Sequence, residues 1–537
     1  MDSVRPTSPP REHVVRVLLL RHWPKGLFAL LALASVVPFW GASHCNWAPG
    51  DDTFIVYTYA KSLAAGRGFV FNHPPATLAA TTPLLTLLLA AIAAISHSAD
   101  FVRMHLLLSA CCWTAAAWSI VLLRRGLRLE LWEAALLGVV LLGAGQPLAL
   151  LSEYFLFEFL LVLTVALHWN QRRIWAGVCA GLLFLTRGEG ALALPVLLGA
   201  CAWEERSPLK RGLTRLFRRG SGAASEAQEK PGGRSSPFRG AARLCLGFLI
   251  PFLLWSVYAL KTFGAILPDS MHAKMAQYES QLWGSFARSL FTVYIPNWEL
   301  QFAIGHHPGL NLWWGLVLLG AFHIAARNPR WLLFPAWAAL YIAGYAALGV
   351  PDSTTYQAPV HFVALIVSGF GFVALIHFAL RLKGSLRIVS VCGAVAAVAG
   401  FLYVMIPYRA ALHLQARGDW TAPTYTQMGL WFHDNTQPSQ SVAYIEIGRL
   451  GYYSGNRIID LAGLLDPEVA RHVARRDFAW EFYRALPDYY VHLADFDWAL
   501  KDIRANPEFG KRYEPVAGMP SPTKSDFVIY ARRDLNR

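Results

Sequence analysis

The sequence predicts a polytopic α-helical membrane protein with a small α/β domain at its C-terminal end. Apolar runs long enough to cross a bilayer recur from Leu27 to Ile406, and charged residues make up only 15% of the chain. From about Tyr408 onward the composition is that of a soluble domain. We expect about eleven membrane crossings and a tail domain outside the cytoplasm.

The basic residues cluster in short loops between apolar runs, which is typical of cytoplasmic loops in membrane proteins. The net charge of +14 is therefore interpreted as a membrane signal, and we expect a lipid bilayer and no nucleic acid as partner. Residues 1–25 are basic and lack the short apolar core and cleavage site of a signal peptide. We expect a cytoplasmic N-terminus and an uncleaved first helix.

The same charge pattern divides the membrane part, residues 26–407, into loops on two sides. The strongest cytoplasmic signal is the basic, Gly- and Ser-rich loop at 204–240. The polar or acidic loops at 41–76 and 261–308 then fall on the outer side, together with the tail domain at 408–537.

Two apolar stretches leave the crossing pattern open. In one solution, Thr77–Leu123 crosses once, so that one of its two apolar runs is interfacial, and Trp175–Ala202 is broken at Arg187. In the other, both runs cross, Trp175–Ala202 is a single span, and Arg124 and Arg125 lie outside. We prefer the first solution because it collects every unusual polar residue on one face.

Alternating apolar residues in the tail domain predict four strands and one helix. The strands are expected at 441–447, 457–461, 488–493 and 526–531, and the helix at 467–476. This domain has no glycine-rich phosphate-binding fingerprint and no catalytic-triad pattern, which favours a scaffold or acceptor-binding role. None of the seven cysteines lies in the spacing of a metal site.

Two adjacent acids, Asp51 and Asp52, follow the first apolar run, where carboxylates are costly to hold beside lipid. The next residues predict a helix along the membrane surface, capped by one of these acids and with an apolar stripe at Ile55, Tyr59 and Leu63. The acids are either a solvated helix cap or a functional pair. In the second case one acid is a general base or cation ligand and the other supports it.

Three further segments place charges where packing alone does not explain them. Glu153 lies between two apolar runs and is either a loop residue or a second carboxylate of the site. Arg187 and Glu189 interrupt a long apolar run, as a local ion pair or as an arginine that holds a phosphate. The segment from Asp269 to Lys274 starts a helix with His272 and Lys274, which is either a solvated loop helix or a phosphate-binding face. Tyr356 and His361 are expected to be structural.

Five segments resemble motifs of one enzyme family in their order and spacing. They are Asp51–Ile55 with Tyr59 and Gly66, Ser152–Tyr154, Arg187–Gly190, Leu267–Ser270 with Ala273 and Lys274, and Gly451–Tyr453 with Asp460 and Asp466. The family is that of bacterial GT-C membrane glycosyltransferases, including terminal arabinofuranosyltransferase-like and aminoarabinose or protein mannosyl transferase-like enzymes. Three positions depart from its pattern: Thr58 replaces a frequent Arg, Gly188 a Pro, and Glu446 a common Asp. The missing Arg weakens any transfer of donor specificity.

The resemblance implies transfer of a sugar from a polyprenyl phosphate to a hydroxyl of a cell-envelope glycan, lipid or protein, at the outer face of a bacterial inner membrane. It implies Asp51 as general base, with Asp52 and Glu153 in support, and an inverting attack. Lys274, Arg187 and His272 are expected to bind the donor phosphate, and Tyr59, Glu189 and Asp269 the substrates. A divalent cation at Asp51, Asp52 and Glu153 is left open.

Two other classes of function also place acids beside membrane spans. A transporter is expected to show internal repeats and broken helices near the bilayer midplane, and no convincing repeat is seen. An envelope signalling or assembly protein with an external sensor domain is the second alternative.

Overall fold

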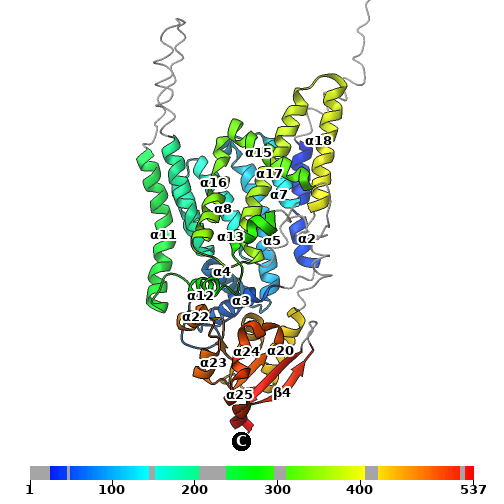
Figure 1. Cartoon of the computed structure of the whole chain (residues 1–537). Coiled ribbons are helices and arrows are strands. Elements are labelled where there is room, and N and C mark those ends of the chain that lie inside the picture. Colours follow the sequence, from blue (N-terminus) through cyan, green and yellow to red (C-terminus); the bar gives the residue numbers. More distant parts are fainter. Residues whose placement is uncertain are drawn as a thin grey trace, which may run out of the picture.

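A computed structural model describes residues 25–44, 49–143, 152–204, 237–295, 310–405, 421–520 and 526–536. A bundle of helices forms the larger part, and a mixed α/β tail domain lies beyond one end of it (Figure 1). The expected basic N-terminus, most of the basic loop at 204–240 and part of the loop at 261–308 lie outside the described residues.

The bundle contains helices of two lengths. Four helices among the described residues are long and apolar enough to cross a membrane, and six further apolar helices are shorter. The long ones are α5 (Phe101–Leu122), α11 (Pro237–Phe263), α17 (Ala358–Arg381) and α18 (Gly384–Met405). The shorter ones include α4 (Pro83–Ser96), α7 (Leu131–Gly143), α8 (Tyr154–Trp169), α9 (Arg173–Thr186) and α15 (Leu310–Arg327). The bundle also contains α2 (Val37–His44) and α16 (Leu333–Ala347). The membrane-protein fold is confirmed, whereas the number of eleven crossings stays a prediction.

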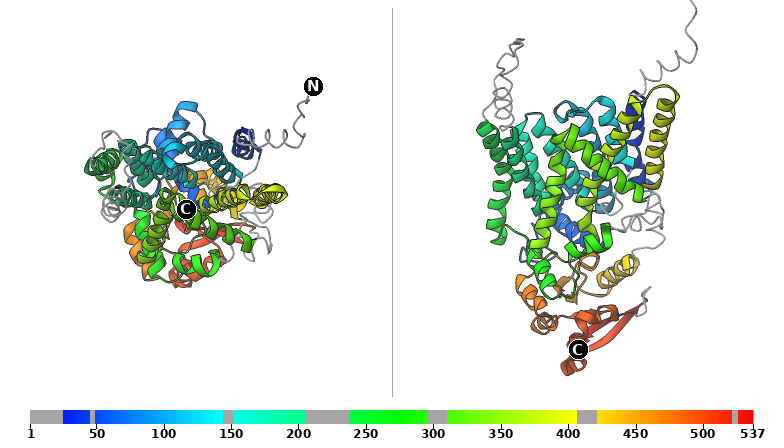
Figure 2. Two further views of the ribbon diagram at one scale, coloured as in Figure 1. Left: turned by 90° about the horizontal axis from the view of Figure 1, so that it is seen from above. Right: turned by 45° about the horizontal axis from the view of Figure 1, so that its top comes forward.

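Glycines allow pairs of these helices to pack with their backbones in contact. A Cβ atom added to Gly177 of α9 would lie 2.1 Å from the carbonyl oxygen of Leu244 in α11, and one on Gly247 would lie 2.1 Å from that of Ile174. Small residues of this kind are the usual basis of close helix packing in membranes, where lipid provides no hydrophobic drive between helices. α11 and α18 lie at opposite edges of the bundle (Figure 2).

The tail domain is built on a five-stranded sheet of order β2-β1-β3-β5-β4. β1 (Ser441–Tyr444), β2 (Arg457–Asp460) and β3 (Tyr489–His492) are parallel, and β5 (Phe527–Arg532) pairs antiparallel with β3 and with β4 (Tyr513–Met519). The four predicted strands are confirmed, and β4 was not predicted. The helices around the sheet are α20 (Thr421–Asn435), α21 (Gly448–Ser454), α22 (Pro467–Ala474), α23 (Ala479–Ala485), α24 (Asp497–Ala505) and α25 (Pro507–Arg512).

Two short helices lie between the bundle and the tail domain (Figure 1). α3 (Asp51–Ala64) is the predicted surface helix, and Ile55 and Tyr59 of its stripe are buried. Its N-cap is Gly50, so the expectation that an acid caps it is wrong, because Asp51 and Asp52 form its first turn. α12 (Asp269–Glu279) starts at the predicted position and packs against α22. These two helices carry the acid pair and Lys274 to the same junction.

We expect Gly177→Leu to separate α9 from α11. An added side chain overpacks the contact and is expected to lower the free energy of unfolding by about 1–3 kcal/mol. Thermal unfolding of the purified protein in detergent measures this. Gly344→Leu in α16 is the control, because a Cβ there meets no atom within 4 Å. Equal stability of the two variants would show that the glycine contact is not needed.

Candidate functional site

Asp51 joins the surface helix to the tail domain. Its carboxylate accepts hydrogen bonds from the backbone N–H groups of Gly448 (2.7 Å) and Arg449 (2.8 Å) at the start of α21. A Cβ atom on Gly448 would lie 1.9 Å from the Asp51 carbonyl oxygen, so only glycine permits this approach. Burial raises the pKa of Asp51 to about 6, against the opposing effect of the two hydrogen bonds. Both oxygens of this carboxylate are thus occupied by the docked domain.

The Arg449 side chain strengthens the same junction. Its guanidinium donates to the carbonyl of Pro49 and lies 4.4 Å from the ring centre of Phe54. The amide of Asn72 donates to the carbonyls of Gly451 (2.8 Å) and Asn456 (3.0 Å). The first loop and the tail domain therefore form one interface built from both side-chain and backbone groups.

Lys274 lies on α12 and faces this junction. Burial lowers the pKa of its ammonium group, but Tyr356, Asp52 and Glu446 together outweigh burial, so the pKa is raised overall and the group stays charged. Among the described residues, its Nζ makes no hydrogen bond and no ion pair. Lys274 is thus a cation near two acids, with its donor hydrogens available.

Asp52 and Glu446 reach this place from different parts of the chain. Asp52 is exposed on the first turn of α3, whereas Glu446 follows β1 at the carboxyl edge of the parallel strands. Ligands of α/β domains commonly bind at that edge, and here the edge faces the bundle. The candidate site therefore includes one acid from the membrane part and one from the tail domain.

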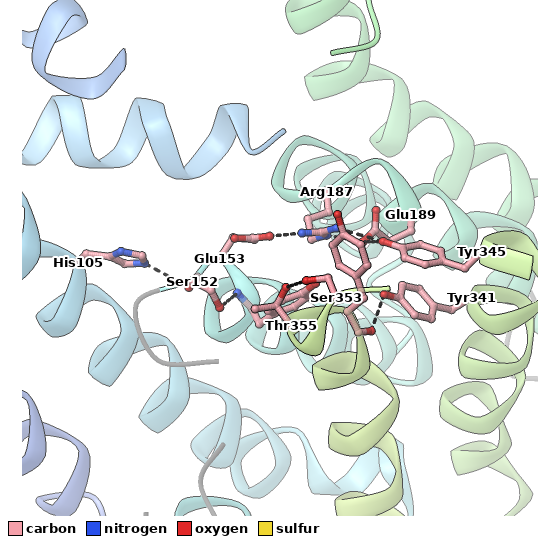
Figure 3. Close-up of polar contacts among 11 residues, drawn as sticks. His105, Ser152, Glu153, Arg187, Glu189, Tyr341, Tyr345, Ser353 and Thr355 are labelled. Atoms are coloured by element: carbon pink, nitrogen blue, oxygen red, sulfur yellow. Dashed lines mark hydrogen bonds and ion pairs between the residues drawn. The ribbon is translucent and has the colours of Figure 1, made fainter. Parts of the chain in front are cut away.

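Arg187 is the centre of a second polar group close by (Figure 3). The guanidinium forms ion pairs with both Glu153 and Glu189, and it donates to the Tyr345 hydroxyl at 3.1 Å. The Tyr345 hydroxyl in turn donates to Glu189 at 2.9 Å. With two carboxylates on one guanidinium, this side chain has no charge left to balance a phosphate.

Rings cover the two sides of the same guanidinium. Its central carbon lies 5.0 Å from the ring centre of Tyr154 and 5.3 Å from that of Tyr356. The expectation that Arg187 binds the donor phosphate is thus not supported by its contacts. The arginine joins α8, α9 and α16 at the edge of the site, and Tyr356, which packs on it, is near enough to raise the pKa of Lys274.

His105 connects this group to the surface helix. Its Nε2 lies 3.2 Å from the carbonyl oxygen of Ser152, which can only accept, so Nε2 carries the proton and donates (Figure 3). Its Nδ1 then accepts from the Tyr57 hydroxyl of α3 at 3.0 Å. The residue after Ser152 is Glu153, so one buried histidine fixes α3 relative to the Glu153–Arg187 pair.

Two of the predicted substrate-binding residues, Tyr59 and Asp269, and the predicted phosphate-binding residue His272 have other surroundings. Tyr59 is fully buried, and its hydroxyl is bonded to Thr77 at 2.8 Å. The backbone N–H of Asp269 donates to the carbonyl oxygen of Leu78 at 2.7 Å. This hydrogen bond joins α12 to the segment before α4. His272 is exposed and lies near Asp269. It is two residues from Lys274 in the chain, so the two side chains point more than half a helical turn apart. The structure does not bring these side chains to the Lys274 ammonium group.

The acids do not gather into a metal site. Among the described residues, no group of three or more His, Cys, Asp and Glu side chains is arranged to hold a metal ion. Glu153 is paired with Arg187, and Asp51 with backbone N–H groups, so the expected trio of Asp51, Asp52 and Glu153 does not fit a divalent cation.

The sequence pointed to Lys274 and to the acid pair, expected Tyr356 to be structural, and assigned no role to Glu446 or Tyr345. Glu446 lies near the carboxyl end of the strand predicted at 441–447, and the carboxyl ends of parallel strands are frequent binding positions, so this signal was present. Tyr345 is an aromatic residue in apolar surroundings, and nothing in its local pattern marks it, whereas Tyr356 lies in the polar stretch 351–357.

Asp51→Asn is expected to change how stability depends on pH. Because the pKa in the native state is about 6 and the ordinary value is 3.8, the native protein binds the proton more tightly than the unfolded chain. The stability contribution of Asp51 therefore falls as pH rises from about 4 to about 6, and is constant above about pH 7. Asn does not titrate, so the wild-type melting temperature should fall relative to Asp51→Asn over this range.

Melting temperatures measured from pH 4 to pH 8 check this, with the exposed Asp502→Asn as control. If the wild-type melting temperature rose relative to that of Asp51→Asn between pH 4 and pH 6, the burial of Asp51 would be contradicted.

Comparisons with known proteins agree with this architecture. A family model described as a domain of unknown function, DUF8728, matches residues 411–531, which is the tail domain. No curated protein matches the chain. Two crystal structures of ArnT from Cupriavidus metallidurans, one bound to undecaprenyl phosphate and one in the apo state, are similar with TM-scores of 0.54 and 0.55. Each is 13% identical, and the match covers 94% of this chain and 98% of that one. The chain therefore has the fold of ArnT, a GT-C glycosyltransferase.

Proposed function

We propose that the protein transfers a sugar from a polyprenyl-phosphate donor to an acceptor hydroxyl, on the membrane face that carries the tail domain. The observation that carries the proposal is the Lys274 ammonium group, which is charged, has no direct partner among the described residues and lies close to acids. The ArnT-like fold supports it, because one of the similar ArnT structures is bound to undecaprenyl phosphate.

Lys274 is the proposed ligand of the donor phosphate. A lipid-linked phosphate stays at the membrane surface, and α12 holds Lys274 at the junction between the bundle and the tail domain. An ammonium group placed there balances the negative charge that grows on the phosphate as the sugar leaves. Arg187 acts indirectly, by keeping Tyr356 next to Lys274.

The general base is proposed to be an acid of the first turn of α3. The contacts favour Asp52 over Asp51, because Asp52 is exposed whereas both oxygens of Asp51 bind backbone N–H groups. The base takes the proton of the acceptor hydroxyl as its oxygen forms a bond to the anomeric carbon. The bond from that carbon to the phosphate oxygen breaks, and the polyprenyl phosphate leaves with the electron pair. Attack opposite the phosphate inverts the anomeric centre.

Glu446 is proposed to orient the acceptor. It is the acid that the tail domain contributes near Lys274, so the tail domain takes part in the choice of acceptor. Within the resemblance, the sugar is a hexose or pentose, of the arabinosyl or mannosyl type. The acceptor is a cell-envelope glycan, lipid or protein. The same resemblance places the protein in a bacterial inner membrane, with a cytoplasmic N-terminus and the tail domain outside.

The test is transfer of radiolabelled sugar from polyprenyl-phosphate donors in proteoliposomes. Lys274→Ala is expected to lower kcat/KM by about 10²–10³-fold, because one charged donor to the transition state is lost. Lys274→Arg should retain part of the activity, since the charge remains. Lys511→Ala on the tail surface is the matched control. Full activity of Lys274→Ala, or movement of a solute across the bilayer without use of any donor, would overturn the proposal.

A second pair of variants distinguishes the roles of Asp51 and Asp52. Asp52→Asn is expected to lower kcat by about 10²–10⁴-fold with little change in melting temperature, as for the loss of a general base. Asp51→Asn should mainly change stability. The reverse result would assign the base to Asp51, as the resemblance implies.

A further inference from the structure

α12 exposes an apolar stripe along one side. The stripe consists of Leu267, just before the helix, and Met271, Met275 and Tyr278 within it. Leu267, Met275 and Tyr278 are 46%, 38% and 39% exposed, and Met271 is partly exposed. The spacing of three to four residues places Met271, Met275 and Tyr278 above one another on one face of the helix, and Leu267 immediately precedes it. Four apolar side chains are thus partly exposed in a row.

The other sides of α12 have different surroundings. Ala273, Ala276 and Gln277 are buried against the rest of the protein, whereas His272 and Glu279 are exposed polar residues. One helix therefore presents a protein-facing side, an exposed apolar side and an exposed polar side. An exposed apolar side next to an exposed polar side allows a helix to lie in the plane of a membrane interface.

The stripe follows a candidate membrane-spanning helix whose exposed side is apolar. α11 is long and apolar enough to cross a membrane, and its exposed side includes Leu253, Leu254 and Val257 near its end. The exposed Lys261 in its last turn is a usual anchor at the border between lipid and water. Because the stripe follows this border directly in the chain, it begins at the depth of the lipid headgroups.

Positive charge lies beside the stripe, on α22. This helix packs against α12, and Nε of Arg476 donates to the Ser280 carbonyl at the end of α12 at 2.7 Å. Arg471 and Arg475 are exposed at i and i+4, on the same side of α22. Neither forms an ion pair or side-chain hydrogen bond within the part of the chain that the structure describes. Two arginines at membrane level complement anionic phospholipid headgroups.

We propose that α12 and α22 together form a clamp on the bilayer surface. The stripe enters the border of the acyl chains, and Arg471 and Arg475 bind anionic phospholipid headgroups. The clamp fixes the depth of α12 and thereby holds Lys274 at the level of lipid phosphates. It concerns membrane binding and does not depend on the transfer reaction.

The depth of the stripe is tested with a nitroxide label on Met275→Cys in nanodiscs, in a protein whose native cysteines are replaced. The label should be more accessible to oxygen, which enters lipid, than to a water-soluble nickel chelate. The control is Val516→Cys on β4, an exposed apolar position on the tail domain. There the label should be more accessible to the chelate than to oxygen. If Met275→Cys does not fold, Leu267→Cys serves the same measurement. Equal chelate access at the stripe and at the control would overturn the proposal.

The arginines are tested by native mass spectrometry with phosphatidylglycerol and phosphatidylcholine of equal chain length. The wild-type protein should retain phosphatidylglycerol preferentially, and Arg471→Gln with Arg475→Gln should weaken that preference by about fivefold per arginine. Arg457→Gln, exposed at the start of β2, is the control. An unchanged preference in the double variant would overturn the role of these arginines.

Discussion

The carboxylate of Asp51, bound to the first backbone N–H groups of α21, is the interaction on which the site depends. It holds the carboxyl edge of the tail sheet against the surface helix, with Gly448 allowing the close approach. That edge brings Glu446 to Lys274, and the first turn of α3 brings Asp52 there. Without this docking, the membrane part and the tail domain would each carry half of a site.

Two positively charged side chains near that junction, Arg187 and Lys274, differ in how their charge is balanced. Arg187 is fully paired with Glu153 and Glu189 and is covered by tyrosine rings, as a charge at the edge of an apolar bundle needs to be. Lys274 keeps its charge without a direct partner among the described residues. A paired arginine is a structural element, whereas an unpaired ammonium group is suited to an incoming phosphate.

Local patterns predicted the fold class, the surface helix, the start of α12 and four strands of the tail sheet, because each depends on residues close in sequence. The partners of the charged residues could not be predicted in this way. Asp51 and Gly448 are 397 positions apart, and Arg187 and Glu153 are 34 apart. The sequence marked Arg187 and Asp51 as unusual charges, but only the folded chain shows that their charges are already satisfied.

The central claim is that Lys274 holds the phosphate of a lipid-linked sugar, and binding of polyprenyl phosphate to the purified protein measures it most directly. Titration of the wild-type protein, Lys274→Ala and the control Lys511→Ala gives the three dissociation constants. We expect binding to be at least about tenfold weaker for Lys274→Ala and unchanged for the control, since a charge-assisted hydrogen bond is lost. Equal affinity of wild type and Lys274→Ala would contradict it.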